Sequence, residues 1–470
     1  MKILLVAHGF PPEQVGGVEL HTQALAFALA RRGHTVLVVA GTLAKSSVAE
    51  GIEVRRERVT GEDNERIDVA RIARHDLYFD HWHKSLDAGV ARAFRDLLRE
   101  FTPDVVHVQH WLRLSRDLVA VAAREGVPSV VTLHDAWSSC PIVFRVKPGT
   151  HEACDAAVGP SPCVKCAGRV PPRTPWIPIE NGYLLLAERQ RDIARELQLA
   201  RAVITPSAAH ARALERHLGL AEGALAAAVI APCPPRAPRA LAPRSADDTA
   251  VLRIATWSQI ARHKGLDVLV EAFLAASAQL AGTARLELEI LGAEAEPEFA
   301  ASLRARTSGA PVRWKGAFPP ADPGASLDAR VALFVSASRA EESYGVSVDE
   351  AARLGLALLL PDAPAWLERC GGVAEFYARG DAGALAAKLV ELAREPERLS
   401  SARNRALDFA ARLPSLESIV TRHEEIYARA LSAGAPTVAP ASWFDARMAS
   451  EATLAWDRAL SSRTAAELGL

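Results

Sequence analysis

Two glutamates eight positions apart carry the strongest chemical signal in this 470-residue sequence. Glu342 stands in a predicted turn with Gly345, and Glu350 lies further on, within the helix predicted from Val346 to Leu354. The first N–H groups of a helix have no partner inside it and favour an anion, while carboxylates accept hydrogen bonds from sugar hydroxyls. The pattern predicts a site for a diphosphate with a sugar on each side, which is a nucleotide sugar. An acidic turn followed by a solvated helix face is the structural alternative.

The E-x7-E pattern, with Ala351, Ala352 and Gly355 after it, resembles the donor-site motif of retaining glycosyltransferases of family 4. The resemblance implies the α/β GT-B fold, in which two Rossmann-like, doubly wound parallel-sheet domains face a cleft and a C-terminal helix crosses back. It implies a hexosyltransferase that moves a sugar from a nucleotide-diphosphate sugar to an acceptor hydroxyl with retention, in glycan, polysaccharide or glycolipid biosynthesis. It also implies that Ser343 and Tyr344 line the donor site, and that no catalytic metal is needed.

A cation for the diphosphate is expected in Arg262-His263-Lys264-Gly265. The resemblance assigns this role to Lys264, because a departing diphosphate gains charge that a fixed cation stabilises in the transition state. The family usually has Gly-Arg shortly before this lysine, where the present chain has Ser258-Gln259. We therefore expect Gln259 and Arg262 beside the donor, with Arg262 as the candidate substitute for the absent arginine.

Two glycine motifs at predicted strand ends are further candidates for donor contacts. Gly16-Gly17 lies between the first strand and its helix, where glycine lets the backbone approach a phosphate closely. Gly292 belongs to a sequence that resembles the family's G-x-G at the nucleotide pocket, with Glu294 in place of the second glycine. Ordinary strand-end turns are the alternative for both. Neither motif is a G-x-G-x-x-G, so a dinucleotide dehydrogenase is disfavoured.

His134 ends another predicted strand, and ligands of open α/β sheets bind at the carboxyl ends of strands. Through its T-x-H-D pattern, the resemblance implies that the imidazole hydrogen-bonds the donor sugar and that His134, Lys264 and Glu342 form the catalytic set. A structural histidine is the alternative. We interpret His107 and His110, at the end of the preceding strand, as structural.

Four of the six cysteines lie in one Pro-rich segment, residues 138–178. They are Cys140, Cys154, Cys163 and Cys166. The last two form C-x2-C, a spacing that lets two thiolates chelate one metal. Because so many prolines argue against a core within the segment, a structural zinc held by all four thiolates would supply its folding energy. Reduced thiols without a metal, or a disulfide pair, are the alternatives.

The elements that must position these residues form two series of alternating strands and helices. The first series predicts an acceptor-side N-terminal domain, residues 1–230, which contains the Cys/Pro-rich insertion. Prolines crowd residues 231–249, which we interpret as a linker. The second series predicts the donor domain, residues 250–415. Residues 416–470 are predicted to form the C-terminal helix that returns to the N-terminal domain, followed by a tail.

Composition and charge exclude several classes. With 49% hydrophobic residues the chain can bury substantial cores, and a net charge of -1 gives no general attraction to nucleic acid. The apolar N-terminal run is too short for a secretory signal, and no run is long enough to span a bilayer. We therefore expect a cytoplasmic protein, with the inner face of the membrane as a further location. Arg92, Arg95 and Arg99 could contact that surface, although a solvated helix face is the alternative.

The expected partners are a nucleotide-sugar donor and a glycan, lipid-linked or small-molecule acceptor, without nucleic acid. Two other functions stay open. A nucleotide-sugar epimerase or phosphorylase could use a similar two-domain frame, the first without an acceptor and the second with inorganic phosphate. A non-catalytic nucleotide-sugar-binding scaffold is favoured by the missing arginine and the altered G-x-G.

Overall fold

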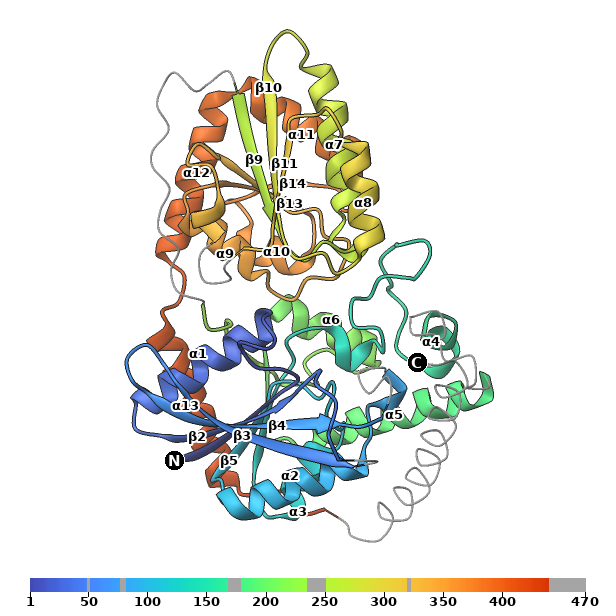
Figure 1. Cartoon of the computed structure of the whole chain (residues 1–470), viewed down its shortest axis with the longest axis vertical. Helices are drawn as coiled ribbons and strands as arrows, with labels where there is room; N and C mark the ends of the chain where they lie inside the picture. The colour runs from blue at the N-terminus through green and yellow to red at the C-terminus, as the bar shows by residue number, and fades with distance from the viewer. Residues whose placement is uncertain (49–50, 77–81, 168–178, 235–250, 319–322, 439–470) are drawn as a thin grey trace.

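The computed structural model describes residues 1–48, 51–76, 82–167, 179–234, 251–318 and 323–438. Two sheets organise these residues (Figure 1). The strands of the first sheet are β1 (Lys2–Ala7), β2 (Thr35–Gly41), β3 (Ile52–Thr60), β4 (Arg66–Arg74), β5 (Val105–Val108), β6 (Ser129–Thr132), β7 (Ala202–Thr205) and β8 (Ala228–Val229). The strands of the second sheet are β9 (Val251–Trp257), β10 (Arg285–Leu291), β11 (Val312–Gly316), β12 (Leu333–Val335), β13 (Ala357–Pro361) and β14 (Glu375–Tyr377).

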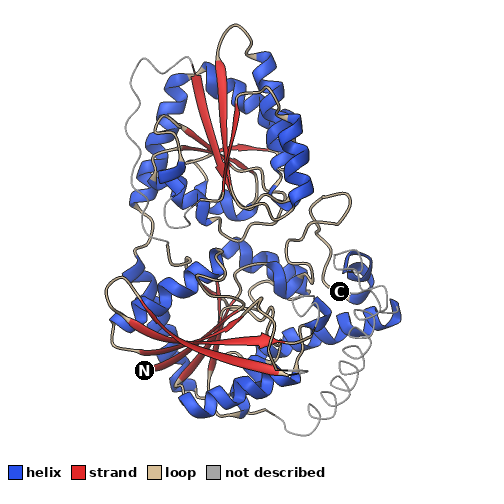
Figure 2. Ribbon diagram, viewed as in Figure 1, coloured by secondary structure: helices blue, strands red, loops and turns tan. Residues whose placement is uncertain are grey.

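Helices flank both sheets (Figure 2). Those of the N-terminal half are α1 (Gly17–Arg31), α2 (Ala88–Phe101), α3 (Leu118–Arg124), α4 (Pro160–Ala167), α5 (Ile179–Leu199) and α6 (Ala208–Leu218). Those that follow are α7 (Leu266–Gln279), α8 (Pro297–Arg306), α9 (Val346–Arg353), α10 (Pro364–Cys370), α11 (Ala382–Arg394), α12 (Pro396–Ala411) and α13 (Leu416–Ala433). Because helices cover both faces, the central strands β1, β5 and β13 are buried and apolar apart from the exposed Lys2 and the buried His107.

The strand orders explain where a ligand can bind. The first sheet has the order β3-β4-β2-β1-β5-β6-β7-β8, and the second has β11-β10-β9-β12-β13-β14. Their strand pairs are parallel, apart from the antiparallel pair β3–β4. Each sheet reverses its winding beside its first strand, β1 or β9, and ligands of such sheets bind at the carboxyl ends of the strands at this switch point.

The C-terminal helix α13 returns to the first sheet, as the resemblance implied (Figure 1). Tyr427 on α13 shares a 2.7 Å hydrogen bond with His107 of β5. Arg32, just after α1, forms an ion pair of 2.5 Å with Glu424. His107 also meets the hydroxyl of Thr132 at 2.7 Å and is fully buried, which confirms its structural interpretation.

Two parts of the fold differ from, or fall outside, the expected pattern. The antiparallel hairpin of β3 and β4 is not among the predicted elements, because four consecutive charged residues, 55–58, interrupt the apolar pattern of its edge strand. Most of the predicted linker, residues 235–249, and the tail, residues 439–470, lie outside the described residues.

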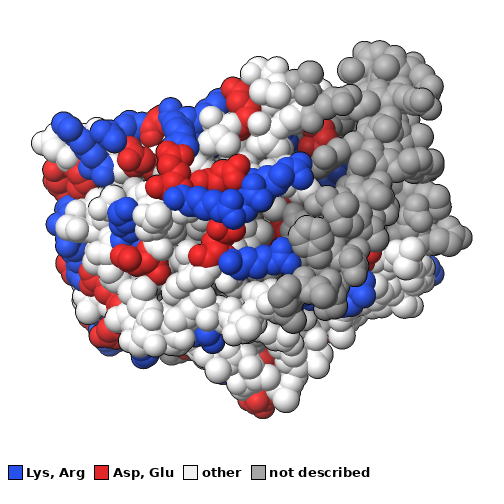
Figure 3. Space-filling model, turned by 90° about the horizontal axis from the view of Figure 1, so that it is seen from below, with Lys and Arg blue, Asp and Glu red and all other residues white. Residues whose placement is uncertain are grey.

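The described residues on the face seen from below form no basic membrane patch. Figure 3 shows Lys and Arg interspersed with Asp and Glu over the visible part of this face. Arg99 on α2 pairs with Glu125 at 2.8 Å, and Arg95 pairs with its neighbour Asp96 at 3.0 Å. Among the described helices, none has the length and apolar character needed to cross a membrane. Peripheral membrane contact stays a prediction.

Candidate active site

A cavity of about 180 Å³ lies at the switch point of the second sheet. Its lining comes from the end of β9, the turns after β12 and before α9, and the start of α1. The lining residues are Gly17, Thr256, Trp257, Ser258, Lys264, Ser336, Ala337, Glu342, Gly345, Val346, Ser347 and Trp366. The cavity thus brings together four predicted site residues, Gly17 from the first half of the chain and Lys264, Glu342 and Gly345 from the second.

Lys264 and Glu342 form an ion pair in this cavity, with 2.9 Å between Nζ and Oε1. The hydroxyl of Ser338 donates a second hydrogen bond of 2.6 Å to the same carboxylate oxygen. Burial raises the pKa of Glu342, but the charge of Lys264 and the hydrogen bonds from Ser338 and Lys264 outweigh it and hold that pKa below its ordinary value. Glu342 is therefore ionised at neutral pH, and its charge holds the ammonium group of Lys264 at the cavity.

A tight 3₁₀ turn, Arg262–Lys264, carries the lysine and ends at Gly265. Gly265 has φ +65°, and a Cβ there would collide with the carbonyl oxygen of Ala337. Only glycine lets this turn pack so closely on the segment after β12. The turn is thereby fixed against the strand end that leads to Glu342.

The turn before α9 depends on Gly345 in the same way. Gly345 has φ +82°, and a Cβ there would collide with Nε1 of Trp366. That indole nitrogen donates a 3.1 Å hydrogen bond to the carbonyl oxygen of Tyr344, which fixes the turn. Val346 and Ser347, the first residues of α9, line the cavity, and the N–H groups of a helix start have no partner within the helix, as an anion site requires.

We expect Gly345→Ala to lower the free energy of unfolding by about 1–3 kcal/mol more than Gly380→Ala does, because only the first variant adds a steric clash. The two glycines share nearly the same φ, +82° and +80°, but a Cβ at Gly380 would meet nothing within 4 Å. Urea unfolding of both variants measures the difference. Equal losses would show that Trp366 does not restrict this position.

Glu350, the second glutamate of the pattern, is buried behind the cavity wall. It accepts a 2.8 Å hydrogen bond from Nε1 of Trp257, which lines the cavity. Burial raises the pKa of Glu350 to about 7, although the hydrogen bond from Trp257 acts in the opposite direction. Its ability to accept hydrogen bonds from two hydroxyls therefore changes near neutral pH.

We expect nucleoside diphosphate affinity to rise as the pH increases through about 7, because ionised Glu350 can accept hydrogen bonds from both ribose hydroxyls with both oxygens, whereas its protonated form is a weaker acceptor. Glu350→Gln should bind more weakly at pH 8.5 and lose most of the pH dependence. Calorimetric titration with UDP and ADP from pH 5.5 to 8.5 measures both effects. Titration of the phosphate itself contributes equally in both proteins, so the difference between their pH profiles reports on Glu350. An equal slope in both proteins would contradict the role of Glu350.

Three predicted donor contacts do not line the cavity. The guanidinium of Arg262 pairs with Glu296 at 3.3 Å and lies 4.7 Å from the ring centre of Phe299. The hydroxyl of Tyr344 donates to Asp349 at 2.8 Å. Gln259 does not line the cavity, although Ser258 beside it does. Arg262 therefore does not replace the absent arginine in this arrangement.

The other predicted contacts have mainly structural surroundings. Gly292 lies at the end of β10, where a Cβ would collide with the carbonyl oxygen of Ser258. Gly16 caps α1 in an extended conformation, and a Cβ there would come within 2.7 Å of the Glu19 carboxylate. The carbonyl of Ser343 accepts a 2.7 Å hydrogen bond from the hydroxyl of Ser207 in the first half of the chain.

His134 lies at the carboxyl end of β6, outside the cavity lining. Its Nε2 is 2.6 Å from the side-chain oxygen of Gln109, and its ring lies 4.8 Å from that of His21. Burial lowers the pKa of His134 to about 3, although the charge of Asp135 acts in the opposite direction. The imidazole is therefore neutral, so that it can orient a hydroxyl but cannot act as a cation.

The predicted metal ligands are Cys140, Cys154, Cys163 and Cys166. Within the described ranges, no group of three or more His, Cys, Asp or Glu side chains could hold a metal ion, and the thiols as placed do not fit a zinc site. Buried arginines anchor this part of the chain: Arg145 donates to the carbonyl oxygens of Ser139 and Cys154, at 2.9 and 2.8 Å, and Arg189 donates to that of Trp137, just before the segment. Zinc content stays a prediction, which elemental analysis of protein purified without chelators tests.

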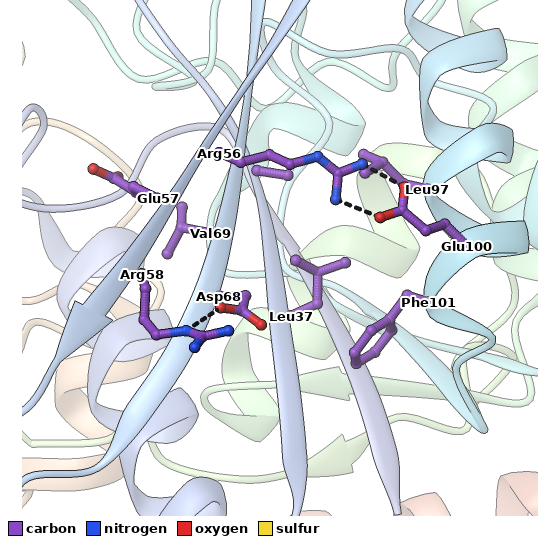
Figure 4. Close-up of a pocket in the computed structure, with 10 residues that line it drawn as sticks. Leu37, Arg56, Glu57, Arg58, Asp68, Val69, Leu97, Glu100 and Phe101 are labelled. Atoms are coloured by element: carbon purple, nitrogen blue, oxygen red, sulfur yellow. Dashed lines mark hydrogen bonds and ion pairs between the residues drawn. The ribbon is translucent and has the colours of Figure 1, made fainter.

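A second hollow of about 470 Å³ lies between α2 and the strands β2, β3 and β4 (Figure 4). Its floor is apolar and its rim is charged, but the charged groups are paired. Arg56 holds Glu100 through two hydrogen bonds, Arg58 holds Asp68 at 2.7 Å, and Glu57 pairs with an arginine on β4. Although larger, this hollow has neither the start of a helix nor a strand end at a switch point in its lining, so we assign the donor to the cavity beside Lys264.

Three important residues were missing from the sequence interpretation. They are Trp257, Ser338 and Trp366, which hold Glu350, Glu342 and the turn before α9, respectively. Trp257 ends β9, and the strand-end rule that selected His134 could have found it. The other two carry no local signal, because their partners become neighbours only in the folded chain.

Comparison with solved structures shows which fold this architecture has. Sucrose-phosphate synthase from Thermosynechococcus elongatus superposes with a TM-score of 0.64 at 16% identity, over 92% of this chain and 100% of that one. The fold is GT-B. Two further GT-B structures are the Anabaena protein HepE in complex with UDP and glucose, with a TM-score of 0.58 at 16% identity, and the catalytic domain of starch synthase IV from Arabidopsis thaliana bound to ADP and acarbose, with 0.59 at 14%. They cover 91% and 92% of this chain and 99% of each structure.

Sequence comparison confirms the resemblance to glycosyltransferase family 4. Residues 15–227 match the model of Glycosyltransferase Family 4. This match lies in the first half of the chain, whereas Glu342 and Glu350 lie outside it. Glycogen synthase of Mycobacterium tuberculosis is 30% identical over 145 residues, which are 28% of this chain and 33% of that protein. The chain thus spans about a third of the length of this curated relative.

Proposed function

We propose that this GT-B protein is a retaining glycosyltransferase that moves a hexosyl group from a nucleotide-diphosphate sugar to an acceptor hydroxyl. The observation that carries the proposal is the cavity in which Gly17 faces the Lys264–Glu342 ion pair and the first turn of α9. A diphosphate in this place meets the lysine, unpaired helix N–H groups and a glycine that leaves room for it. The UDP and ADP complexes of proteins with the same fold support a nucleotide donor.

The proposed reaction uses no protein nucleophile. The bond between the anomeric carbon and the diphosphate oxygen breaks, and the acceptor hydroxyl oxygen forms a bond to that carbon on the same face. The proton of the hydroxyl passes to the departing diphosphate. Lys264 stabilises the charge that grows on this leaving group, and Glu342 orients Lys264 and the sugar. The neutral imidazole of His134 is assigned to a sugar hydroxyl, and Glu350 to the ribose.

One observation favours a second candidate function, a nucleotide-sugar-binding protein without turnover. Ser258 lines the cavity near the place where family 4 usually has an arginine, and Arg262 is directed to Glu296. The cavity therefore offers a departing diphosphate less positive charge than the resemblance implied. Such a protein would bind the donor and release no diphosphate.

The test is nucleoside diphosphate release from a panel of UDP-, GDP-, ADP- and TDP-sugars, with melting temperature as the measure of binding. A transferase should release diphosphate slowly from one donor, because water replaces the missing acceptor. Stabilisation by a donor without release, even when glycan, lipid-linked and small-molecule acceptors are added, would favour the binding protein. Conversion of a donor to an epimeric nucleotide sugar, without an acceptor and without net release of diphosphate, would indicate an epimerase.

A further inference from the structure

An aromatic contact joins the Cys/Pro-rich segment to the loop that carries Lys264. The rings of Phe144 and His263 are stacked, with 3.7 Å between centroids and an interplanar angle of 5°. Phe144 belongs to the first half of the chain, and His263 precedes Lys264 in the second. The stack therefore crosses between the two halves beside the proposed donor site.

The turn that presents Phe144 is strained and firmly anchored. Val143 has φ +73° and Arg145 has φ +53°, a conformation that is costly for side chains with a Cβ and most of all for a β-branched residue. Arg145 is buried and holds the turn through three carbonyl oxygens, those of Ser139, Cys154 and Ala156. Phe144 itself is 42% exposed, so its position is not explained by burial in a core.

His263 connects this contact to Glu342 through its backbone. Its carbonyl oxygen accepts hydrogen bonds from the backbone N–H groups of Arg339, at 2.9 Å, and Ala340, at 3.2 Å. These residues lie in the turn that leads to Glu342. One residue therefore contacts Phe144 with its ring, the Glu342 turn with its carbonyl oxygen and Lys264 through the peptide bond.

A second contact between the halves lies beside Glu342. The carboxylate of Glu341 is 3.4 Å from the ring nitrogen of His217 and 3.8 Å from the guanidinium of Arg216, both on α6. Glu341 therefore contacts α6 of the first half, whereas the adjacent Glu342 pairs with Lys264 in the cavity. The loop of Lys264 and the loop of Glu342 thus each carry one member of the ion pair and one contact with the first half of the chain.

We propose that Phe144 is a positioning residue, which couples approach of the two halves to the placement of Lys264 against Glu342. The inference deepens the proposed transferase function and rests on it. Without the ring, the Arg262–Lys264 turn loses its support from the first half, and a smaller fraction of molecules holds Lys264 at the diphosphate. Phe144 acts through His263 and contacts none of the reacting groups.

The experiment compares Phe144→Ala, Phe144→Tyr and the control Leu43→Ala, which truncates another exposed apolar residue of the first half. Hydrogen exchange of the amides of Lys264 and Gly265, measured without donor, reports on the turn independently of activity. These amides donate to Ala261 and Arg262, both at 3.0 Å. In Phe144→Ala we expect faster exchange there and a fall of about fivefold in kcat/KM for the donor, since one aromatic pair is lost. Phe144→Tyr should restore both, and Leu43→Ala should change neither.

Two results would overturn the proposal: unchanged exchange in Phe144→Ala, or faster exchange with unchanged kcat/KM. A loss of activity that Phe144→Tyr does not restore would also count against it, because tyrosine preserves the stacking ring. If the wild-type protein releases no diphosphate from any donor, the transferase proposal fails. In that case exchange and UDP affinity of Phe144→Ala still decide whether the stack positions the turn, since both are measured without turnover.

Discussion

Lys264→Ala is expected to lower kcat/KM for the nucleotide-sugar donor by about 10²–10³-fold, the usual cost of removing one group that stabilises developing charge. Its Nζ lies 2.9 Å from Glu342 in the cavity, and its side chain is 27% exposed, so that a diphosphate can reach it. The loss should appear mainly in kcat, because the charge grows as the diphosphate leaves. Initial rates of diphosphate release at several donor concentrations measure it.

Arg262→Ala is the matched control, since it removes a cation two residues away from the same turn. The guanidinium of Arg262 faces Glu296 and Phe299, so the control should lose much less activity than Lys264→Ala. Both proteins should keep the melting behaviour of a folded GT-B protein. Wild-type rates in folded Lys264→Ala, or an equal loss in both variants, would remove Lys264 from the leaving-group site.

Glu342→Gln is expected to lower kcat/KM by about 10²-fold, because small misplacements of a catalytic group have effects of this size. The amide keeps the size of the side chain and can still accept the hydrogen bond from Ser338, but it loses the charge that holds Lys264. We expect Lys264 to become more mobile and the donor sugar to lose a charged hydrogen-bond acceptor. Steady-state kinetics with the donor found in the panel measures the effect.

Glu341→Gln is the appropriate comparison, since it changes the adjacent carboxylate. Glu341 faces His217 and Arg216 rather than the cavity, so a smaller loss is expected. If Glu341→Gln were as inactive as Glu342→Gln, the turn as a whole would matter rather than the ion pair. If Glu342→Gln kept full activity, the carboxylate would have no part in the reaction.

Much of the fold could be predicted from the sequence because apolar runs mark buried parallel strands. The strand predicted before His134 is β6, and the helix predicted from Val346 to Leu354 is α9, which spans Val346–Arg353. The hairpin of β3 and β4 escaped prediction because Arg56 and Arg58 occupy its edge strand and pair with Glu100 and Asp68. These ion pairs form only in the folded chain, so the charged residues that make them give no strand pattern in the sequence.

The candidate site was predictable to the extent that its residues lie at strand ends and glycine turns. Gly17, Lys264 and Glu342 meet in one cavity although more than 240 positions separate the first from the second, because both sheets direct their carboxyl ends to it. Side-chain direction was not predictable. Arg262 stands next to the right place in sequence, but a 3₁₀ turn sends neighbouring side chains in different directions.

The cysteine segment shows the same limit. The C-x2-C spacing predicts a chelate, yet spacing alone does not decide whether Cys140 and Cys154 approach the other two thiols. The structure holds the segment with Arg145 and Arg189, whose buried guanidinium groups bind carbonyl oxygens. Neither arginine belongs to a recognisable motif, so these contacts had no signal in the sequence, and the zinc site stays a prediction.

The most direct test of the central claim is a crystal structure with the nucleoside diphosphate that the donor panel identifies. We predict that its distal phosphate lies within hydrogen-bond distance of Nζ of Lys264 and the first N–H groups of α9, with Gly17 opposite and the ribose beside Glu350. A diphosphate bound anywhere else, such as in the hollow between α2 and β3, or a ligand in the cavity without contact to Lys264, would contradict it.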